Sequence, residues 1–339
     1  MGRVLVTGAT GFLGGAIARR LRDLGRDVAG LGRSPERGDA LERDGIPFLE
    51  ADVRDAAAVA RAVEGCERVV HCAAVYHEQK LSPASFLAIN AGGTENVLAA
   101  CGKAGVARLV HVSTVNVYGR LRTTPATEDH PFGDLNPFQR SKVEAERRVW
   151  SAPADLRRRV AVVRPSGIYG PGDPKFPNMY RALARGRFAW VGPCRTRYHA
   201  TFRDDAVDGI VRALDAENAG GRAYNLAGPR AVTLREFVLA AARAVGAPPP
   251  RLRVPLWPVR AAAFACEMLC RPFGIDPPLH RRRLTFFTVD HAYAIDRARA
   301  ELGYDPKTDV DEGHARAVAW CRDRGIIGAG SGGGVPTGP

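Results

Sequence analysis

A glycine-rich segment near the N-terminus has the residue types and spacing that bind a pyrophosphate. It reads Thr7-Gly8-Ala9-Thr10-Gly11-Phe12-Leu13-Gly14, directly after a short apolar run and before a helical pattern. Gly8 suits a tight turn, Gly11 lets the backbone approach phosphates closely, and Gly14 permits close helix packing, while the helix N-terminus favours negative charge. A flexible turn is the plainer alternative. The pattern predicts a dinucleotide site made by Gly8, Thr10, Gly11, Phe12, Leu13 and Gly14.

The end of the second predicted strand bears on which dinucleotide binds. An NAD-preferring site usually places a carboxylate there for the ribose 2′-hydroxyl. This chain has Gly30-Leu31-Gly32-Arg33-Ser34, without an acid. The guanidinium of Arg33, helped by Ser34 and Arg37, suits a 2′-phosphate instead, so the sequence favours NADP(H) over NAD(H). A solvated loop arginine is the alternative interpretation.

Further motifs give the chain a family resemblance along nearly its whole length. With the glycine segment, they resemble the extended short-chain dehydrogenase/reductases of the epimerase/dehydratase family. The resemblance implies that Asp52 and Val53 border the adenine of the cofactor. It also implies that Ala73 and Ala74 line the cofactor, and that Pro165 lies near the nicotinamide. The motifs occupy residues 51–55, 71–74, 90–96, 112–119 and 164–172.

Later segments, at 302–306 and 311–313, resemble the branch with 3β-hydroxysteroid dehydrogenases and long-chain 2-alkyl-3-keto acid reductases. The pair Asp204-Asp205 also falls where the family carries two aspartates, and a helix N-cap is favoured over catalysis. Residues 254–275 are rich in large apolar side chains, which suit either a cover for a hydrophobic substrate or an ordinary core helix. These side chains are Leu256, Trp257, Phe264, Met268, Leu269 and Phe273.

The chain departs from the family at the position that carries the chemistry. The family uses a Tyr-x-x-x-Lys pair one helical turn apart, with a Ser or Thr that hydrogen-bonds the substrate oxygen. Its lysine holds the nicotinamide ribose and lowers the pKa of the tyrosine, which exchanges a proton with that oxygen. Lys142 and Thr114 match the lysine and the Ser/Thr, but Phe138 stands at the tyrosine position. The cofactor side of the site is therefore expected to be intact, while its usual proton donor is missing.

Three explanations of Phe138 remain open. The chain is an enzyme with another acid, for which Tyr76 and His77, just beyond the fourth predicted strand, are candidates; both also suit simple surface packing. It is a catalytically silent NADP(H)-binding sensor or partner-binding protein. Or the phenylalanine is a deliberate replacement of tyrosine. Because a positioned acid contributes about 10² to 10⁴ in rate, its loss is large without necessarily abolishing turnover.

The elements that position these residues follow from the hydrophobic pattern. Short β-branched runs alternate with helical patterns that begin near Phe12, Ala56, Pro83 and Phe138. This alternation is typical of an α/β fold with a doubly wound parallel Rossmann sheet. The expected strands cover residues 3–7, 27–31, 47–50, 68–72, 107–113 and 160–164.

The pattern changes after Arg164, where prolines and glycines become frequent and single helices follow. We expect an NADP(H)-binding Rossmann domain at 1–165, with a return at 201–227 that includes a strand at 223–227. A smaller, mostly helical substrate part covers 166–200 and 228–327, and 328–339 form a disordered tail. The expected helices of the substrate part cover residues 178–184, 233–245, 258–270 and 310–324.

Composition limits the remaining function classes. The 339 residues carry 49 Lys and Arg against 36 Asp and Glu, but the basic runs lack interleaved aromatic residues, so nucleic-acid binding is not expected. No apolar run is long enough to span a membrane, and the expected location is cytoplasmic. The seven cysteines have no metal-ligand spacing, so neither a metal site nor disulfides are expected.

Taken as an enzyme, the chain is expected to transfer hydride between NADP(H) and a carbonyl or alcohol. The substrate is a small molecule, with a hydrophobic 3-keto or 3-hydroxy compound as one option. Nucleotide-sugar epimerisation or dehydration is the enzymatic alternative. The resemblance also implies a possible homodimer through the helices matching residues 83–105 and 138–150.

Overall fold

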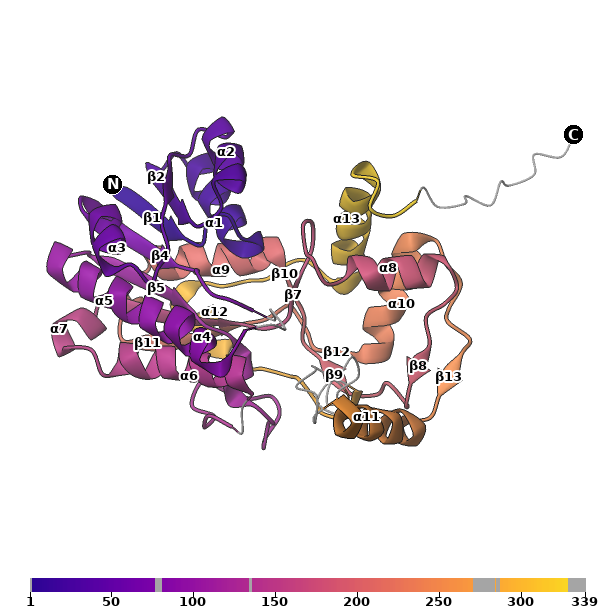
Figure 1. The fold of residues 1–339 in the computed structure, drawn as a ribbon. Helices are drawn as coiled ribbons and strands as arrows, with labels where there is room; N and C mark the ends of the chain where they lie inside the picture. The colour runs from indigo at the N-terminus through magenta and orange to yellow at the C-terminus, as the bar shows by residue number, and fades with distance from the viewer. Residues whose placement is uncertain (1, 77–80, 134–135, 271–283, 285–286, 329–339) are drawn as a thin grey trace, which may run out of the picture. The chain divides into compact units, whose positions relative to one another are not determined.

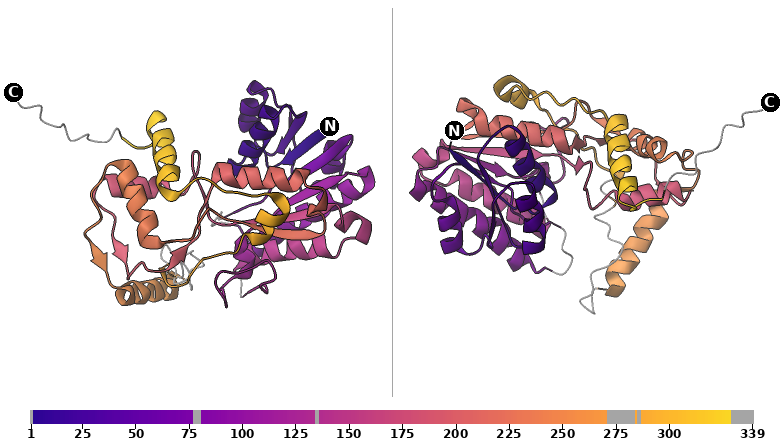
Figure 2. Two further views of the ribbon diagram at one scale, coloured as in Figure 1. Left: turned by 180° about the vertical axis from the view of Figure 1, so that it is seen from behind. Right: turned by 90° about the horizontal axis from the view of Figure 1, so that it is seen from above.

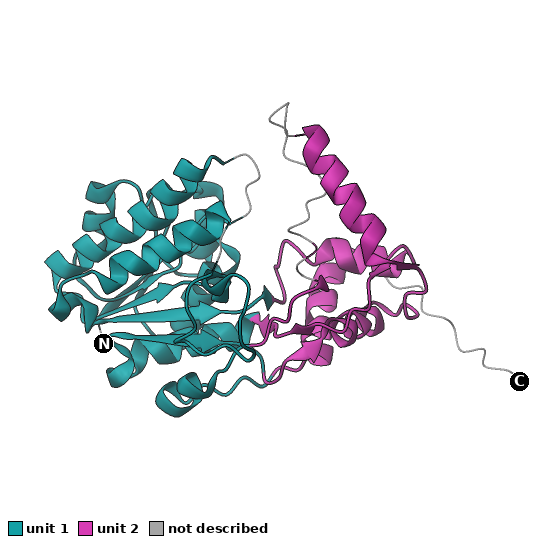
Figure 3. Ribbon diagram, turned by 90° about the horizontal axis from the view of Figure 1, so that it is seen from below, with its two compact units in different colours: residues 1–168, 203–228, 293–307 teal, residues 169–202, 229–292, 308–339 magenta. Residues whose placement is uncertain are grey.

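The computed structural model describes residues 2–76, 81–133, 136–270, 284 and 287–328. It divides into two compact units, shown in different colours in Figure 3. Unit 1 comprises residues 1–168, 203–228 and 293–307 and contains the sheet. Unit 2 comprises residues 169–202, 229–292 and 308–339. The two units are described separately below.

A seven-stranded parallel sheet forms the centre of unit 1 (Figure 1). Its order is β11-β6-β5-β4-β1-β2-β3, so the order reverses between β1 and β4. This reversal defines the topological switch point at which doubly wound folds bind dinucleotides. The strands are β1 (Arg3–Thr7), β2 (Val28–Gly32), β3 (Phe48–Glu50), β4 (Cys66–His71), β5 (Arg108–Val112), β6 (Val160–Pro165) and β11 (Arg222–Leu226).

Helices cover both faces of the sheet, as the alternating pattern predicts. On one face, α1 (Phe12–Asp23) and α9 (Arg203–Asp215) lie side by side and pack on a core that includes Val4 and Val70 (Figure 2). On the other face, α3, α5 and α6 pack on a second core. The further helices of unit 1 are α2 (Pro35–Arg43), α3 (Ala56–Val63), α4 (Pro83–Phe86), α5 (Gly93–Ala104), α6 (Pro137–Trp150), α7 (Ala154–Arg157) and α12 (Asp296–Leu302), with a π-helix η1 (Leu87–Gly92) and 3₁₀ turns η2 (Val115–Tyr118) and η3 (Glu217–Ala219).

The doubly wound sheet and its returning strand are confirmed, since β11 pairs in parallel with β6. The favoured N-cap interpretation of Asp204 and Asp205 is wrong, because α9 begins at Arg203 and both aspartates lie in its first turn. There their negative charges favour the helix through its dipole. Residues 293–307, which the sequence analysis placed in the substrate part, belong to unit 1, because the hydroxyl of Tyr304 donates to the carbonyl of Ala227.

Unit 2 is built from helices and two-residue strands. Its core gathers aromatic side chains, among them Tyr169, Tyr180 and Phe237, around the buried His314. Nδ1 of His314 lies 2.9 Å from the hydroxyl of Tyr180. The elements are β7 (Ile168–Tyr169, which begins in unit 1), α8 (Pro177–Ala184), β8 (Trp190–Val191), β9 (Arg197–Tyr198), β10 (Thr201–Phe202), β12 (Val232–Thr233), α10 (Leu234–Val245), β13 (Arg253–Val254), α11 (Leu256–Cys270) and α13 (Val310–Asp323).

Helix α11 is not the core helix that its apolar sequence allowed. Ala263 is its single fully buried residue, and several of its large apolar side chains are exposed. Among the described residues, no helix has both the length and the apolar character needed to cross a membrane. All seven cysteines are free thiols.

Candidate active site

The glycine segment forms a tight cradle between β1 and α1. Gly8 has a φ of +71°, and a Cβ there would lie 2.7 Å from Cα of Ala73. A Cβ on Gly14 would lie only 2.2 Å from the carbonyl oxygen of Gly8. Gly11 caps α1 with extended backbone and is exposed, so the helix begins at Phe12 with its first N–H groups toward this turn. The cradle therefore fits a pyrophosphate, because any side chain at Gly8 or Gly14 would close it.

Two arginines flank the carboxylate of Asp52 near the ends of β2 and β3. Arg54 donates to Asp52 from its backbone N–H (2.9 Å) and from its guanidinium (2.8 Å), and these bonds hold the pKa of Asp52 below its usual range. Nη1 of Arg33 lies 3.7 Å from the same carboxylate. Both guanidinium groups are about half exposed. The loop thus presents two guanidinium groups to an incoming anion; the sequence indicated Arg33, with Ser34 and Arg37 as helpers, but not Arg54.

The backbone around these residues is closely packed. Val53 is buried, and a Cβ on Gly93 of α5 would lie 2.6 Å from its side chain. A Cβ on Gly32 would lie 2.7 Å from Oγ1 of Thr10. Thr10 and Gly32 therefore bring the glycine segment against the end of β2, beside Arg33.

Hydrogen-bond contacts of the His71 side chain hold the end of β4 in place. Its Nδ1 lies 2.8 Å from Oγ1 of Thr7, and its Nε2 lies 3.1 Å from Oγ1 of Thr94. Burial lowers the pKa of His71 to about 3, so the ring is neutral at pH 7. The backbone N–H of Ala73 also donates to Oγ1 of Thr7. Ala73 is half-buried and Ala74 exposed, so this edge of the sheet stays open beside the glycine cradle.

Lys142 is held rigidly at the end of β5. It lies on α6, where it is 3% exposed, and Nζ donates to the carbonyl of Val112 at 2.9 Å. Burial lowers the pKa of Lys142 to about 8, so it is largely protonated at pH 7. An ammonium group has three hydrogens, so two remain for other acceptors. The helix itself starts with a capping box between Asn136 and Gln139.

Thr114 follows β5 and caps η2, where its Oγ1 accepts the backbone N–H of Asn116 at 3.2 Å. The hydroxyl hydrogen of such a cap is still available to donate. Pro165 ends β6 and is buried in the sheet. Thr114 and Lys142 are thus both anchored around the end of β5, as the family resemblance implies.

Phe138 lies one helical turn before Lys142 and contacts Tyr76 from the loop after β4. Their ring centroids are 4.8 Å apart with an interplanar angle of 89°, an edge-to-face arrangement. The ring centroid of Phe86 lies 6.3 Å from the ring centroid of Phe138, so this ring packs against Phe138 as well. Tyr76 is 42% exposed. His77, the other candidate acid, lies outside the described residues.

A buried ion pair fixes α6 against the sheet. Nη2 of Arg164 on β6 lies 2.6 Å from Glu146, one turn after Lys142, and Glu146 also accepts the hydroxyl of Ser113 at 2.5 Å. The other side of Arg164 donates to the hydroxyl of Tyr118 at 2.9 Å. Sequence reasoning missed Glu146; the signal was an arginine inside the apolar run of β6, which needs a buried anion.

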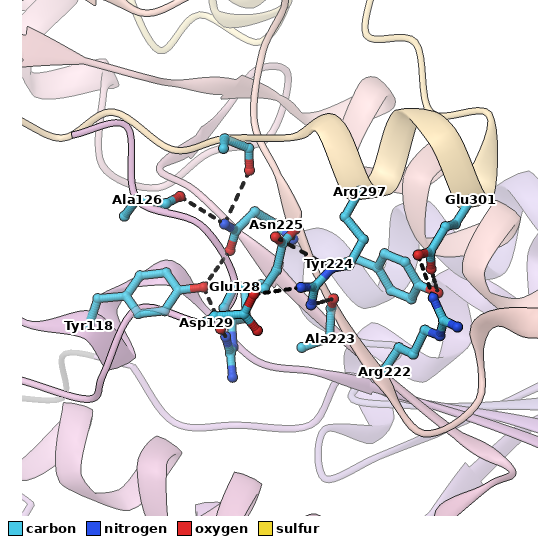
Figure 4. A network of polar contacts seen from close by, with 12 residues as sticks. Tyr118, Ala126, Glu128, Asp129, Arg222, Ala223, Tyr224, Asn225, Arg297 and Glu301 are labelled. Atoms are coloured by element: carbon cyan, nitrogen blue, oxygen red, sulfur yellow. Dashed lines mark hydrogen bonds and ion pairs between the residues drawn. The ribbon is translucent and has the colours of Figure 1, made fainter. Parts of the chain in front are cut away.

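The same network continues toward β11 (Figure 4). The hydroxyl of Tyr118 donates to the side chain of Asn225 at 2.7 Å, and the backbone N–H of Asn225 donates to Glu128 at 2.8 Å. Arg297 on α12 donates to Asp129 at 2.8 Å. These contacts tie the segment after η2, β11 and α12 into one polar cluster within unit 1.

A family model confirms the resemblance: residues 4–227 match the NAD dependent epimerase/dehydratase family, and the chain belongs to it. Within that family it is an extended short-chain dehydrogenase/reductase. The chain is 32% identical over 332 residues to the 2-alkyl-3-oxoalkanoate reductase of Stenotrophomonas maltophilia (strain K279a), covering 94% of this chain and 98% of that protein. It is 30% identical to a 3 beta-hydroxysteroid dehydrogenase/Delta 5-->4-isomerase of Mycobacterium tuberculosis (strain ATCC 25618 / H37Rv), covering 90% and 86%.

Solved structures agree with this assignment. The crystal structure of gox2253 matches with a TM-score of 0.82 and 28% identity, covering 96% of this chain and 99% of that one. DesIV, a dTDP-glucose 4,6-dehydratase from Streptomyces venezuelae with NAD and TYD bound, matches with a TM-score of 0.77 and 25% identity, covering 96% and 98%. The two sequence relatives named above are a reductase and a dehydrogenase by name, and this likeness together with the family match indicates an enzyme.

Proposed function

We propose that the protein is an NADP(H)-dependent oxidoreductase with an altered proton donor, acting on the carbonyl or alcohol of a small, hydrophobic 3-keto or 3-hydroxy compound. The observation that carries the proposal is Lys142, which is buried and donates from Nζ to the carbonyl of Val112 at the end of β5. A lysine that is merely structural gains nothing from burial without a carboxylate partner, because desolvation penalises its charge. The ribose of a nicotinamide cofactor would supply further acceptors for the ammonium group and so offset this cost.

The choice of NADP(H) rests on the charges near Asp52. Asp52 is engaged by Arg54, and the exposed Arg33 lies beside it. A 2′-phosphate would approach two guanidinium groups rather than a free carboxylate. A 2′-hydroxyl alone would leave one net positive charge there, because the single carboxylate of Asp52 faces two guanidinium groups.

The residues divide the work of the reaction. When bound, NADP(H) donates or accepts the hydride. Lys142 orients the ribose with its free N–H groups and contributes positive charge near the reacting carbon. Thr114 donates a hydrogen bond to the substrate oxygen.

Proton exchange falls to Tyr76, whose ring packs edge-on against Phe138. Phe138 has no proton to donate, and a hydroxyl brought in from the neighbouring loop replaces the one that its own ring lacks. On reduction, the Tyr76 hydroxyl protonates the developing alkoxide, and water returns the proton to the phenolate. Tyr76 is exposed enough for that exchange.

The substrate class follows from the relatives named above. Both the 2-alkyl-3-oxoalkanoate reductase and the 3 beta-hydroxysteroid dehydrogenase act on an oxygen at carbon 3 of a largely apolar molecule, as their names state. These two matches each cover at least 90% of this chain.

A homodimer through α5 and α6, and a cytoplasmic location, stay predictions.

A catalytically silent NADP(H) sensor is the second candidate, and Phe138 is the observation that favours it. Calorimetric titration with NADPH and NADH, followed by a turnover screen with 3-ketoacyl, steroid and nucleotide-sugar substrates, separates the candidates. The proposal expects tighter NADPH binding and turnover of an apolar ketone. Binding without turnover across the panel would favour the sensor, and turnover of a nucleotide sugar alone would contradict the substrate class.

A further inference from the structure

Helix α11 presents an apolar surface that unit 2 does not use for its own core. Trp257 is 74% exposed, Leu269 71% and Met268 52%. Trp257 and Met268 share one helical face, at positions i and i+11, and Leu269 borders it. The half-buried Leu256 and the buried Ala263 mark the opposite face, which packs on the unit. Large apolar side chains gathered on one exposed helix mark an interaction surface.

The charge of the chain is concentrated in the same unit. Unit 2 contains 19 Lys and Arg against 9 Asp and Glu, a net charge of +10, whereas unit 1 contains 30 against 27, a net charge of +3. Most of the formal +13 of the whole chain therefore belongs to the unit that carries the exposed apolar helix. The residues of unit 2 that the structure describes still carry 15 Lys and Arg against 8 Asp and Glu, and such an excess of positive charge attracts anions rather than a second copy of itself.

Exposed arginines occur in the segments around β8 and β13 and in the first turns of α11. β13, which directly precedes the helix, pairs in parallel with β8, and the N–H of Trp190 donates to the carbonyl of Leu252 at 2.9 Å. This pairing places residues that flank β8 close to the helix start. The exposed arginines of these segments are Arg187, Arg195, Arg251, Arg253 and Arg260.

The length of α11 defines how it can meet an apolar phase. Its 15 residues are too few for the roughly 20 needed to cross a bilayer. A helix of this length with a tryptophan near one end and arginines at its start suits the interface of a membrane, where apolar side chains enter the acyl boundary and cations meet phosphates. Neither signal alone gives stable binding, but an apolar helix and a basic surface together do.

We propose that unit 2 docks on an anionic phospholipid bilayer through α11. The exposed apolar face of the helix enters the headgroup region, and the arginines at its start contact lipid phosphates. The arrangement holds the enzyme where apolar compounds dissolve. It is independent of the proposed reaction and would hold equally for a silent protein.

Co-sedimentation of the full chain with vesicles tests the proposal. Vesicles of phosphatidylcholine with phosphatidylglycerol should bind the protein, and binding should weaken with added salt. The double variant Trp257→Ser/Leu269→Ser should lower the partition coefficient about 10- to 100-fold, because two large apolar side chains no longer leave water. The matched control Leu24→Ser/Leu49→Ser replaces two exposed apolar residues of unit 1 and should bind as the unmodified protein does.

A second variant separates charge from apolar insertion. Arg251→Gln/Arg253→Gln/Arg260→Gln should weaken binding to the anionic vesicles about fivefold per arginine and flatten the salt dependence. Circular dichroism verifies that each variant is folded, which is expected for exposed positions. Equal binding of Trp257→Ser/Leu269→Ser and the unmodified protein would overturn the proposal. So would sedimentation-velocity data showing that these two side chains mediate self-association while vesicles remain unbound.

Discussion

The two ends of α6 differ in how firmly the rest of unit 1 holds them. At Lys142 and Glu146 the helix is tied to β5 and β6 by buried bonds from both side chains. One turn earlier, the side chain of Phe138 is half-buried and is held by packing, against the rings of Tyr76 and Phe86 and against a hydrophobic core cluster. The part that we propose contacts the cofactor is thus fixed by directional bonds, and the part that we propose contacts the substrate is held by packing.

This difference explains how the family tyrosine could be lost without loss of the site. A Tyr→Phe change removes one hydroxyl from a position that carries no structural hydrogen bond, so the fold tolerates it. A change at Glu146 would strand the buried Arg164, and the fold would not tolerate that. Substrate chemistry can therefore diverge on this scaffold while cofactor binding is preserved.

Replacing Glu146, at the end of α6 that buried bonds tie to the sheet, should have the largest effect on stability. Glu146→Ala leaves the Arg164 guanidinium buried without its carboxylate, which costs about 3 to 5 kcal/mol in the free energy of unfolding. Urea denaturation followed by circular dichroism measures it. Arg147→Ala, on the exposed side of the same helix, is the control and should stay within about 0.5 kcal/mol. Equal stabilities of the two variants would contradict the comparison.

Removing Lys142 tests the same end for function. Lys142→Ala should weaken NADPH binding about 10- to 100-fold, because charge-assisted hydrogen bonds of about 1.5 to 3 kcal/mol are lost. Calorimetry measures the affinity, and Lys103→Ala on the neighbouring α5 serves as the control. Unchanged affinity would show that the lysine has no part in cofactor binding.

Replacing Arg33 tests the preference for NADPH over NADH at the end of the cofactor that carries the 2′-phosphate. Arg33→Ala should narrow the difference between NADPH and NADH binding by about 1 to 3 kcal/mol, mostly by weakening NADPH. Arg37→Ala, also exposed and four residues further along the chain, should change it less. Equal affinities for the two cofactors in the unmodified protein would refute the NADP(H) preference.

The buried His71 at the end of β4 gives the smallest effect, a dependence of stability on pH. The pKa of His71 is lowered to about 3 in the folded protein, whereas an unfolded histidine titrates near 6.5. Between these values the unfolded chain binds the extra proton, so stability falls as pH decreases below about 6.5, by up to about 1.4 kcal/mol per pH unit for this group. His71→Asn should reduce the slope of unfolding free energy against pH between 6.5 and 5. An unchanged slope would mean that His71 is protonated in the fold.

Local sequence signals could predict most of the cofactor side. The glycine cradle, the strand starts and Lys142 each depend on short-range patterns, namely apolar alternation, turn glycines and one helical turn of spacing. The helices α2 and α12 were not predicted from the sequence, because their first turns are polar and their apolar stripes are narrow. Their positions depend on packing against β3 and β11 that no short window contains.

Contacts between distant segments could not be predicted. The Tyr76–Phe138 contact joins residues 62 positions apart, and Arg164 finds Glu146 only when β6 lies beside α6. The exposure of α11 is a further example, because an apolar helix sequence is the same whether a core or solvent faces it. Tertiary placement decides all three.

The most direct test removes the hydroxyl of Tyr76 and then places one on residue 138, whose ring contacts that of Tyr76. Tyr76→Phe should lower kcat for reduction of a small apolar ketone by about 10² to 10⁴, with NADPH affinity unchanged, because only the acid is lost. Phe138→Tyr introduced into Tyr76→Phe should restore activity, and the further change Lys142→Ala should abolish the gain. Full activity in Tyr76→Phe, or no recovery with Phe138→Tyr while NADPH still binds, would contradict the claim that this site lost its own acid and borrowed one from the neighbouring loop.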